Sequence, residues 1–515
     1  MNVTYAIDLS QTGKRNNRGY QAAGCDYLFP HTESDVGRTL LDRMRKQRAL
    51  RYLRCHSPLS SAVAGGEEIG CKVYSEDENG NPVYDFSRIN RLYREWVRRG
   101  IKPIVEVDRF PAELSNRLDE DAPERDEGMP AADRGPKSWR KWRDLIEAFV
   151  RNLVAEFGID EVRSWYFEVW NEPDSWPHND LPTFFRMYDV FAHAVTSVDE
   201  RLRVGGPACY HEGFLKLFLE HVINGTNYVT GERGSRLDFV SYHIYGLSGG
   251  WLRNGPVIQP QVQRFTQSLL WLSRLFALYD MPEGFEFHLN EWGLCSNFFR
   301  SVRDFPALEY RDSEASALFM AKLVDCLWHI EDRYGLETAI VLYWGFAYEA
   351  RQDTPFLGQR SLTTAANIPK PILTCFEMMA RLGETRLNVD NHVPGARCGI
   401  LATRHADDTL AILIYNYEET DDNLEMTDTI RISLAHLDRG QLVGTLTPLD
   451  RERNNTYREW QALGRPERLT DDTLAILRDA AELKAAETIP IPVENGEAVL
   501  KVTLKRHTML LVELA

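Results

Sequence analysis

The chain has 515 residues, 43% hydrophobic and 26% charged, which is long enough for a barrel of roughly 250 to 350 residues and a second, smaller domain. Its formal net charge of -16 argues against nucleic acid or an anionic membrane as the main partner and favours a neutral substrate. The start has no basic stretch followed by an apolar run, and no run of about 18 apolar residues follows, so we expect a cytoplasmic protein without a membrane segment.

The cysteines and histidines do not indicate a metal centre. The eight cysteines are scattered singly, without the paired spacing of a zinc site or a disulfide scaffold, and are expected to be reduced thiols. The 13 histidines also occur singly. We therefore expect no metal and no cofactor. A homo-oligomer is compatible with the sequence.

Short apolar runs alternate with amphipathic segments from about residue 48 to residue 345, which is typical of a parallel α/β fold, and one further strand is expected upstream within Gly19–Cys25. The predicted strands are Gly19–Cys25, Tyr52–His56, Pro103–Val107, Trp165–Trp170, Leu202–Gly205, Leu237–Tyr245, Phe285–Glu291 and Ala339–Trp344. Among the helices between them, Ser87–Arg99 places its apolar residues on one face and stops at Gly100. The pattern predicts a (β/α)8 TIM barrel over residues 11–350.

Two segments stand outside this alternation. Residues 111–136 are acidic and proline-rich and follow a predicted strand, so we expect a long loop at its carboxyl end, serving either the active site or a solvated surface. Residues 351–515 change to short β-like runs, with Asn495-Gly496 as a hairpin turn. They predict an accessory β-sandwich with a helical excursion near residues 456–485, and residues 1–10 are expected to add a strand to it.

The most informative motif is the aromatic strand that ends in Asn171-Glu172-Pro173. Barrel enzymes carry their chemistry at the carboxyl ends of the strands. Pro173 holds the residue before it out of helical geometry, so Glu172 should be displayed over the barrel mouth, with Asn171 able to donate to a substrate hydroxyl. We interpret Glu172 as a general acid/base.

A second predicted strand, Phe285–Glu291, ends in another carboxylate and supplies the partner acid. Two strands separate it from the first, so the two carboxylates come from the fourth and seventh positions of the barrel. Alternation excludes Glu286 from the face of Glu291, whereas Glu168, deeper in the first strand, is interpreted as structural.

Two carboxylates across a barrel mouth suit the cleavage of a glycosidic bond. The transition state needs a proton for the leaving oxygen and negative charge under the anomeric carbon. At a separation of about 5 to 5.5 Å, Glu291 would attack to form a glycosyl-enzyme while Glu172 protonates the leaving group and later deprotonates water. We expect the anionic neighbour to raise the pKa of Glu172.

The sequence resembles glycoside hydrolase family 39, the family of β-xylosidases and α-L-iduronidases, over almost its whole length. The matching segments are FEVWNEP with Glu291, YLRCHSPL, GIKPIVEV, RVGGPA, DFVSYHIYG, LYWGFAYEAR, PFLGQRSLTTAANIPKP and NNTYREWQALGRP. The resemblance implies a subsite for the non-reducing sugar lined by His56, Asn171, His243, Tyr245, Trp344 and Glu349.

The chain departs from many family β-xylosidases around this pocket, at residues 54–57, 292–293 and 357–361. Arg360, in the last of these segments, could meet an anionic sugar or serve a structural pairing. The favoured function is a retaining exo-β-xylosidase or related β-glycosidase that acts on an oligosaccharide or glycoside. The alternatives are an α-L-iduronidase-like uronate glycosidase, a carbohydrate-binding barrel without turnover, and a metal-dependent hydrolase, which lacks a clustered His/Asp signature.

Overall fold

The computed structural model describes residues 2–26, 33–61, 63–64, 67–68, 70–117, 133–175, 180–247, 259–296, 300–346, 354–420 and 423–515. Eight parallel strands among these residues close into a barrel, which confirms the predicted fold class. In barrel order they are β3 (Ala22–Cys25), β4 (Tyr52–Cys55), β9 (Lys102–Val107), β12 (Tyr166–Val169), β13 (Arg203–Cys209), β14 (Phe239–Tyr245), β15 (Glu286–Gly293) and β16 (Thr338–Trp344).

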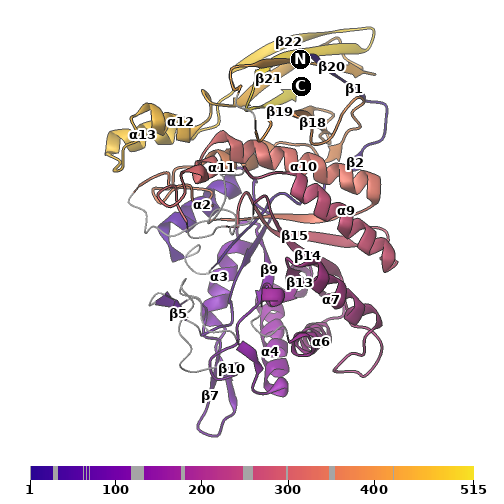
Figure 1. The fold of residues 1–515 in the computed structure, drawn as a ribbon, viewed down its shortest axis with the longest axis vertical. Helices are drawn as coiled ribbons and strands as arrows, with labels where there is room; N and C mark the ends of the chain where they lie inside the picture. Colours follow the sequence, from indigo (N-terminus) through magenta and orange to yellow (C-terminus); the bar gives the residue numbers. More distant parts are fainter. Residues whose placement is uncertain are drawn as a thin grey trace.

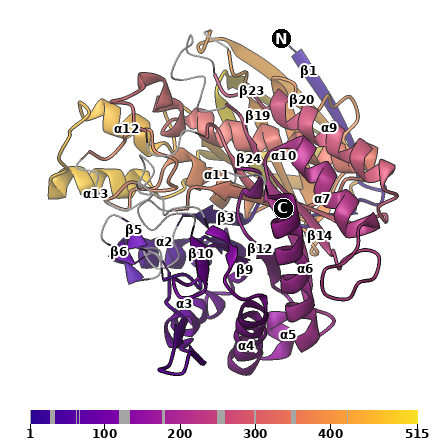
Figure 2. The ribbon, with the colours of Figure 1, turned by 60° about the horizontal axis from the view of Figure 1, so that its bottom comes forward.

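Helices surround the barrel because the outward-facing residues of its strands are apolar and need a cover. They are α2 (Asp35–Lys46), α3 (Ser87–Val97), α4 (Trp139–Phe157), α5 (Ile159–Val162), α6 (Leu181–Val198), α7 (Glu212–Asn224), α9 (Gln263–Leu278), α10 (Glu314–Tyr334) and α11 (Pro371–Met379). Figure 2 shows α3, α4 and α6 outside β9 and β12. Helix α3 is followed by Gly100 at φ +76°, a left-handed position that suits glycine.

Inside the barrel, residues at alternate strand positions form a separate, smaller apolar cluster that includes Ile104, Tyr166, Phe239 and Leu342. The inward positions nearer the carboxyl ends are polar instead. Arg54 and Glu168 are fully buried there. The interior of the barrel therefore changes from apolar to charged side chains toward the carboxyl ends of the strands, where a barrel enzyme binds its substrate.

Strand β13 is longer than predicted and runs to Cys209 rather than stopping at Gly205. The glycines and Pro207 resemble a strand terminus in the sequence. In the barrel, however, a Cβ at Gly205 would lie 2.2 Å from the carbonyl oxygen of Phe239, so the glycine is required for the close approach of the neighbouring strand. Tertiary packing overrides the local signal here.

The ends of the acidic segment 111–136 pair with each other as a short antiparallel ladder of β10 (Ser115–Arg117) and β11 (Asp133–Pro136). Residues 118–132 lie outside the described residues. Other short ladders on this side of the molecule are β5 (Val63–Ala64) with β6 (Glu67–Glu68), and β7 (Tyr74–Glu76) with β8 (Pro82–Tyr84).

A ten-stranded sheet of the described residues forms the accessory unit, and its two halves enclose one apolar core. Its strands are β1 (Asn2–Asp8), β20 (Thr427–Ala435), β23 (Glu497–Lys505), β22 (Glu487–Glu494), β21 (Gln441–Leu449), β24 (Thr508–Leu514), β19 (Leu410–Asn416), β18 (Cys398–Arg404), β17 (Thr385–Arg386) and β2 (Lys14–Arg15). Asn495 and Gly496 both have positive φ between β22 and β23, as a tight hairpin requires.

The sheet lies over α10 and α11, and both chain ends lie at it (Figure 1). Helices α12 (Thr456–Ala462) and α13 (Asp471–Ala480) project from it to one side. The expected boundary between residues 350 and 351 falls outside the described residues, so the exact division into domains stays a prediction. Within the described ranges, no helix is both long and apolar enough to cross a bilayer.

Candidate active site

The cluster of polar side chains inside the barrel is built around Arg54, on β4, whose side chain is completely buried. Its Nη1 donates to Glu291 Oε1 at 3.1 Å, its Nη2 donates to Asn171 Oδ1 at 3.1 Å, and its Nε donates to Glu168. Nη2 also lies 3.0 Å from Glu106 Oε2. The single positive charge of Arg54 can offset only one of these three buried carboxylates, and burial raises the pKa of Glu106 well above its ordinary value.

Glu172 lies three residues beyond the end of β12 and has φ +46°, in the left-handed region. Pro173 disfavours the right-handed helical conformation, as the sequence predicts, and tertiary hydrogen bonds select the left-handed one. The Glu172 N–H donates to the carbonyl oxygen of Ala208 at 2.9 Å, and its own carbonyl accepts the N–H of Ser175 at 2.9 Å. The carboxyl is thus fixed from the neighbouring strand rather than by β12 alone.

Glu291 lies inside β15, which continues to Gly293 instead of ending at the carboxylate. The register with β14 shifts so that Tyr242 faces Leu289 and His243 faces Glu291, which leaves Asn290 as an extra residue. This bulge breaks the alternation on which the sequence prediction relied. Asn290 and Glu291 consequently both point inward: the Asn290 amide donates to the Glu168 carboxylate at 3.0 and 3.1 Å.

Glu172 and Glu291 meet at His243. The Nδ1 atom of His243 lies 2.9 Å from Glu172 Oε1 and 3.6 Å from Glu291 Oε2. A carboxylate oxygen of Glu172 and one of Glu291 lie within 4.8 Å of each other. Carboxyl groups of inverting glycosidases stand about 6.5 to 9.5 Å apart to leave room for a water, whereas about 5 to 5.5 Å is typical of retaining ones.

The pKa values of Glu172 and Glu291 are shifted by different sets of neighbouring groups. Burial raises the pKa of Glu172 to about 7, against the opposing charges of Arg54 and Arg360. The predicted cause, an anionic neighbour, is therefore replaced by desolvation as the main one. Burial also raises the pKa of Glu291, and the neighbouring Glu172 adds to it, whereas His243, Arg54 and the hydrogen bond from Tyr245 lower it.

The other residues implied for the sugar subsite are brought together around this pair, with one exception. The Tyr245 hydroxyl donates to Glu291 Oε2 at 2.7 Å. His56 Nδ1 lies 2.7 Å from Glu106, and its ring packs 4.6 Å from that of Trp344. Burial lowers the pKa of His56 to about 3, so this imidazole is neutral. The exception, Glu349, lies outside the described residues.

The sequence profile of Glycosyl hydrolases family 39 matches residues 4–497. The chain belongs to glycosyl hydrolase family 39. It is therefore a glycoside hydrolase, and the spacing of its two carboxyls agrees with the retaining mechanism.

Relatives of this family 39 enzyme include a β-xylosidase from Caldicellulosiruptor saccharolyticus, 24% identical over 484 residues that cover 92% of this chain and 91% of that protein. The α-L-iduronidase of Homo sapiens is 25% identical over 413 residues, which cover 72% of this chain and 59% of that protein. Among solved structures, a monomeric β-xylosidase from Caulobacter crescentus CB15 superposes with a TM-score of 0.80 at 24% identity, covering 99% of each chain.

Two residues of the family 39 site, Arg54 and Asp26, were not among those predicted from the sequence. Asp26 follows β3, accepts from the Trp344 indole at 3.3 Å and pairs with Arg360 Nη2 at 3.3 Å. A usable signal existed for Arg54: it lies two residues before His56 in an apolar strand, so both share the inward face. A charged residue at that position needs buried partners.

Among the residues that the structure describes, two groups have ligand atoms close enough for a metal ion, namely His56 with Glu106 and Asp108, and Glu172 with His243 and Glu291. Arg54 is a fixed cation 3.0 Å from Glu106 and 3.1 Å from Glu291. Its charge opposes a second cation at either place. The donor sets therefore fit hydrogen bonding better than metal coordination.

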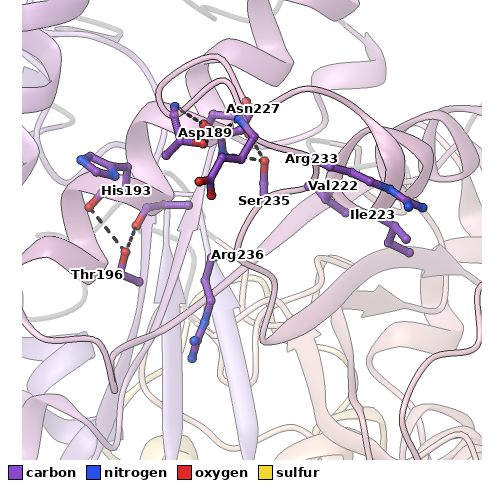
Figure 3. A pocket seen from close by; sticks show the side chains of 13 residues that line it. Asp189, His193, Thr196, Val222, Ile223, Asn227, Arg233, Ser235 and Arg236 are labelled. Carbon is purple, nitrogen blue, oxygen red and sulfur yellow. Dashed lines mark hydrogen bonds between the residues drawn. The ribbon is translucent and has the colours of Figure 1, made fainter.

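A cavity of about 460 Å³ lies apart from these carboxylates, between α6, α7 and the loop that follows α7 (Figure 3). Its buried acid, Asp189, lies 3.2 Å from His221 Nε2 and accepts the N–H of Tyr228 at 2.8 Å and the hydroxyl of Ser235. Asn227 donates to Ser235 at 2.9 Å. These mutual bonds fix the loop, so we assign the cavity no role in catalysis.

Proposed function

We propose that this enzyme is an exo-acting β-xylosidase in which Glu291 is the nucleophile and Glu172 the general acid/base. The observation that carries the proposal is the spacing of the two carboxyls, within 4.8 Å, with different support for their charge. Glu291 receives hydrogen bonds from Arg54 and Tyr245, which favour its anionic form. Glu172 has a pKa of about 7 and can hold a proton for the leaving group.

The reaction has two steps. In the first, a Glu291 oxygen attacks the anomeric carbon, the glycosidic C–O bond breaks, and the Glu172 proton passes to the leaving oxygen. In the second, Glu172 takes a proton from water, the water oxygen bonds to the anomeric carbon, and Glu291 leaves as a carboxylate. His56, Asn171, His243, Tyr245, Trp344 and Glu349 are proposed to hold the terminal sugar.

The nucleophile is tested with Glu291→Gly, which should lose turnover but form an inverted glycosyl azide when azide is supplied. Full activity of this variant would contradict the assignment. Glu286→Gln is the matched control, because Glu286 lies at the start of the same strand and its carboxylate accepts from Tyr166 instead. We expect this control to keep most of its activity.

The acid/base is tested with Glu172→Ala on two leaving groups. Glycosides with poor leaving groups should react much more slowly, whereas activated aryl glycosides should be relatively spared, because only the former need a proton in the first step. Equal losses on both would count against this role. A panel of nitrophenyl glycosides on the native enzyme identifies the sugar.

A uronate is the second candidate substrate, and Arg360 is the observation that favours it. This guanidinium is buried, and its charge acts on both Glu172 and Tyr245. Its pairing with Asp26 already compensates the charge, which supports the neutral sugar instead. Preferential cleavage of an iduronide or glucuronide over the xyloside would reverse this order.

We extend the proposal to the binding partner, the assembly state and the cellular compartment of the enzyme. The net charge of -16 supports a glycoside rather than nucleic acid as the partner. We propose that the enzyme is cytoplasmic. The sequence is compatible with a homo-oligomer, and the mass of the purified protein in light scattering distinguishes an oligomer from a monomer.

A further inference from the structure

An exposed aromatic residue stands at the carboxyl end of the barrel, next to the segment that carries Glu172. Tyr210 directly follows β13, where the residues from Val204 to Cys209 are all buried. Its own side chain is 42% exposed. A tyrosine ring that is open to solvent at this end of a barrel strand is well placed to meet a substrate.

The backbone of Tyr210 is tied to the Glu172 segment by Asp174. One oxygen of Asp174, Oδ2, accepts the N–H of Tyr210 at 2.9 Å and the N–H of His211 at 2.6 Å. Asp174 is two residues after Glu172, in the short 3-10 helix η1 (Pro173–Ser175). Asp174 therefore joins the segment that carries Glu172 to the main chain at Tyr210.

Two further bonds fix the same region. The Tyr242 hydroxyl donates to the carbonyl oxygen of Tyr210 at 2.6 Å, and the Glu172 N–H donates to Ala208 at 2.9 Å. Burial raises the pKa of the Tyr210 phenol, and the charges of Asp174 and Glu172 raise it further. The backbone that carries the Tyr210 ring is thus fixed beside the Glu172 segment, which lowers the entropy cost of binding a ligand there.

We propose that Tyr210 is the platform on which the leaving-group sugar stacks, forming the first aglycone subsite. This inference rests on the proposed function, because Glu172 must protonate the oxygen that joins the two sugars. The ring attached to that oxygen consequently lies on the Glu172 side of the pocket, where Tyr210 is. The ligand class is a neutral pyranose or an aryl ring, whose flat face packs on the phenol.

The same platform would receive an acceptor sugar in the second step. An acceptor hydroxyl then replaces water: its oxygen bonds to the anomeric carbon, its proton passes to Glu172, and the bond to Glu291 breaks. Tyr210 should therefore raise the yield of transfer products relative to hydrolysis at a given acceptor concentration.

The test compares two substrates that share the terminal sugar and differ in the leaving group. Xylobiose places a sugar at the aglycone subsite, whereas β-xylosyl fluoride leaves it without a ring. Tyr210→Ala should lower kcat/KM about tenfold on xylobiose and less than about twofold on the fluoride. Tyr210→Phe should retain the native values on both, because the ring is preserved.

The fluoride also reports whether the variant is folded and Glu291 is intact, and a basic limb of kcat/KM on xylobiose that stays near pH 7 reports that Glu172 is intact. Tyr334→Ala is the matched control, since Tyr334 is 50% exposed at the end of α10, away from the strand ends. Equal loss on both substrates, or an unchanged value on xylobiose, would overturn the platform.

Failure of the native enzyme on both xylosides would overturn only the choice of sugar. The disaccharide and fluoride of the sugar identified by the glycoside panel then decide on Tyr210 with the same expected ratios.

Discussion

Replacing Arg54 by Met removes the cation that three buried carboxylates share. The side chains of Arg54, Glu106 and Glu168 are completely buried, and that of Glu291 is 2% exposed. Methionine fills a similar volume without charge, so the change tests electrostatics rather than packing. We expect a substantial loss in the free energy of unfolding, with a characteristic dependence on pH.

The magnitude follows from the contacts. At 3.1 Å, and with an effective dielectric constant of about 20, the Arg54–Glu291 attraction is about 5 kcal/mol before desolvation is counted. The variant can relieve the lost attraction if one carboxyl takes up a proton. For a carboxyl with an ordinary pKa of about 4.3, this costs about 3.7 kcal/mol at pH 7 and about 1 kcal/mol at pH 5.

We therefore expect Arg54→Met to lose about 3 to 5 kcal/mol at pH 7 and clearly less at pH 5. The sign follows from proton binding. Arg54 lowers the pKa values of Glu106 and Glu291, which burial already raises, so they rise further without it; the folded variant then binds more protons than the native enzyme and loses more stability as pH rises. Urea denaturation followed by tryptophan fluorescence at both pH values measures the two losses.

Arg99→Met serves as the control. Arg99 is also buried, but its partners Asp42 and Glu95 are 61% and 24% exposed and can turn to water when the arginine is removed. We expect a loss of at most about 1 kcal/mol that hardly changes with pH. If Arg54→Met cost no more than this control, or lost equal stability at pH 5 and pH 7, the guanidinium would not be the counter-charge that we describe.

Three further predictions concern the pocket and its support. The kcat/KM of the native enzyme should fall as pH rises through about 7, because Glu172 must carry its proton in the first step, and a basic limb with its midpoint below pH 6 would contradict this pKa. Tyr245→Phe should move the acidic limb to higher pH, because the lost hydrogen bond lowers the pKa of Glu291, and an unmoved limb would refute the contact. Lys370→Met should cost about 3 to 5 kcal/mol in denaturant unfolding, because it breaks a buried pair with Asp312 at 2.6 Å. A double variant that also replaces Asp312 by Leu should regain part of that loss, and no recovery would contradict the pairing.

Residues 358–360 are held by the buried network to which Lys370 belongs. Lys370 Nζ donates to the carbonyl oxygen of Gln359 at 2.7 Å, and Tyr343 donates to that of Arg360 at 2.7 Å. Asp312 accepts the N–H of Gly358 at 2.5 Å. The Lys370 variant should therefore also change KM, because the charge of Arg360 acts on Glu172 and Tyr245, which belong to the proposed site.

Several features could be predicted from local sequence because their causes are local. An apolar run with polar flanks forms a buried strand wherever it is placed, which is why the barrel strands were found with shifts of a few residues at their ends. Asn495-Gly496 supplies two residues that tolerate positive φ, and a hairpin follows. Glu172 was found because the residues around it carry the signal of a strand end.

Other features depend on neighbours that are distant in the chain. The bulge at Asn290 arises from register with β14, so alternation along β15 could not reveal that Asn290 and Glu291 share the interior. The role of Arg54 depends on three carboxylates from β9, β12 and β15. No local pattern states which acids a buried arginine will meet.

The sequence by itself determined the order of strands and helices and the two carboxylates of the candidate site, because hydrophobic periodicity and strand-end residues act over a few positions. Only the tertiary structure decided how those carboxylates are charged. Desolvation and the positions of Arg54, His243 and Tyr245 set their pKa values, and these quantities exist only once the barrel has closed.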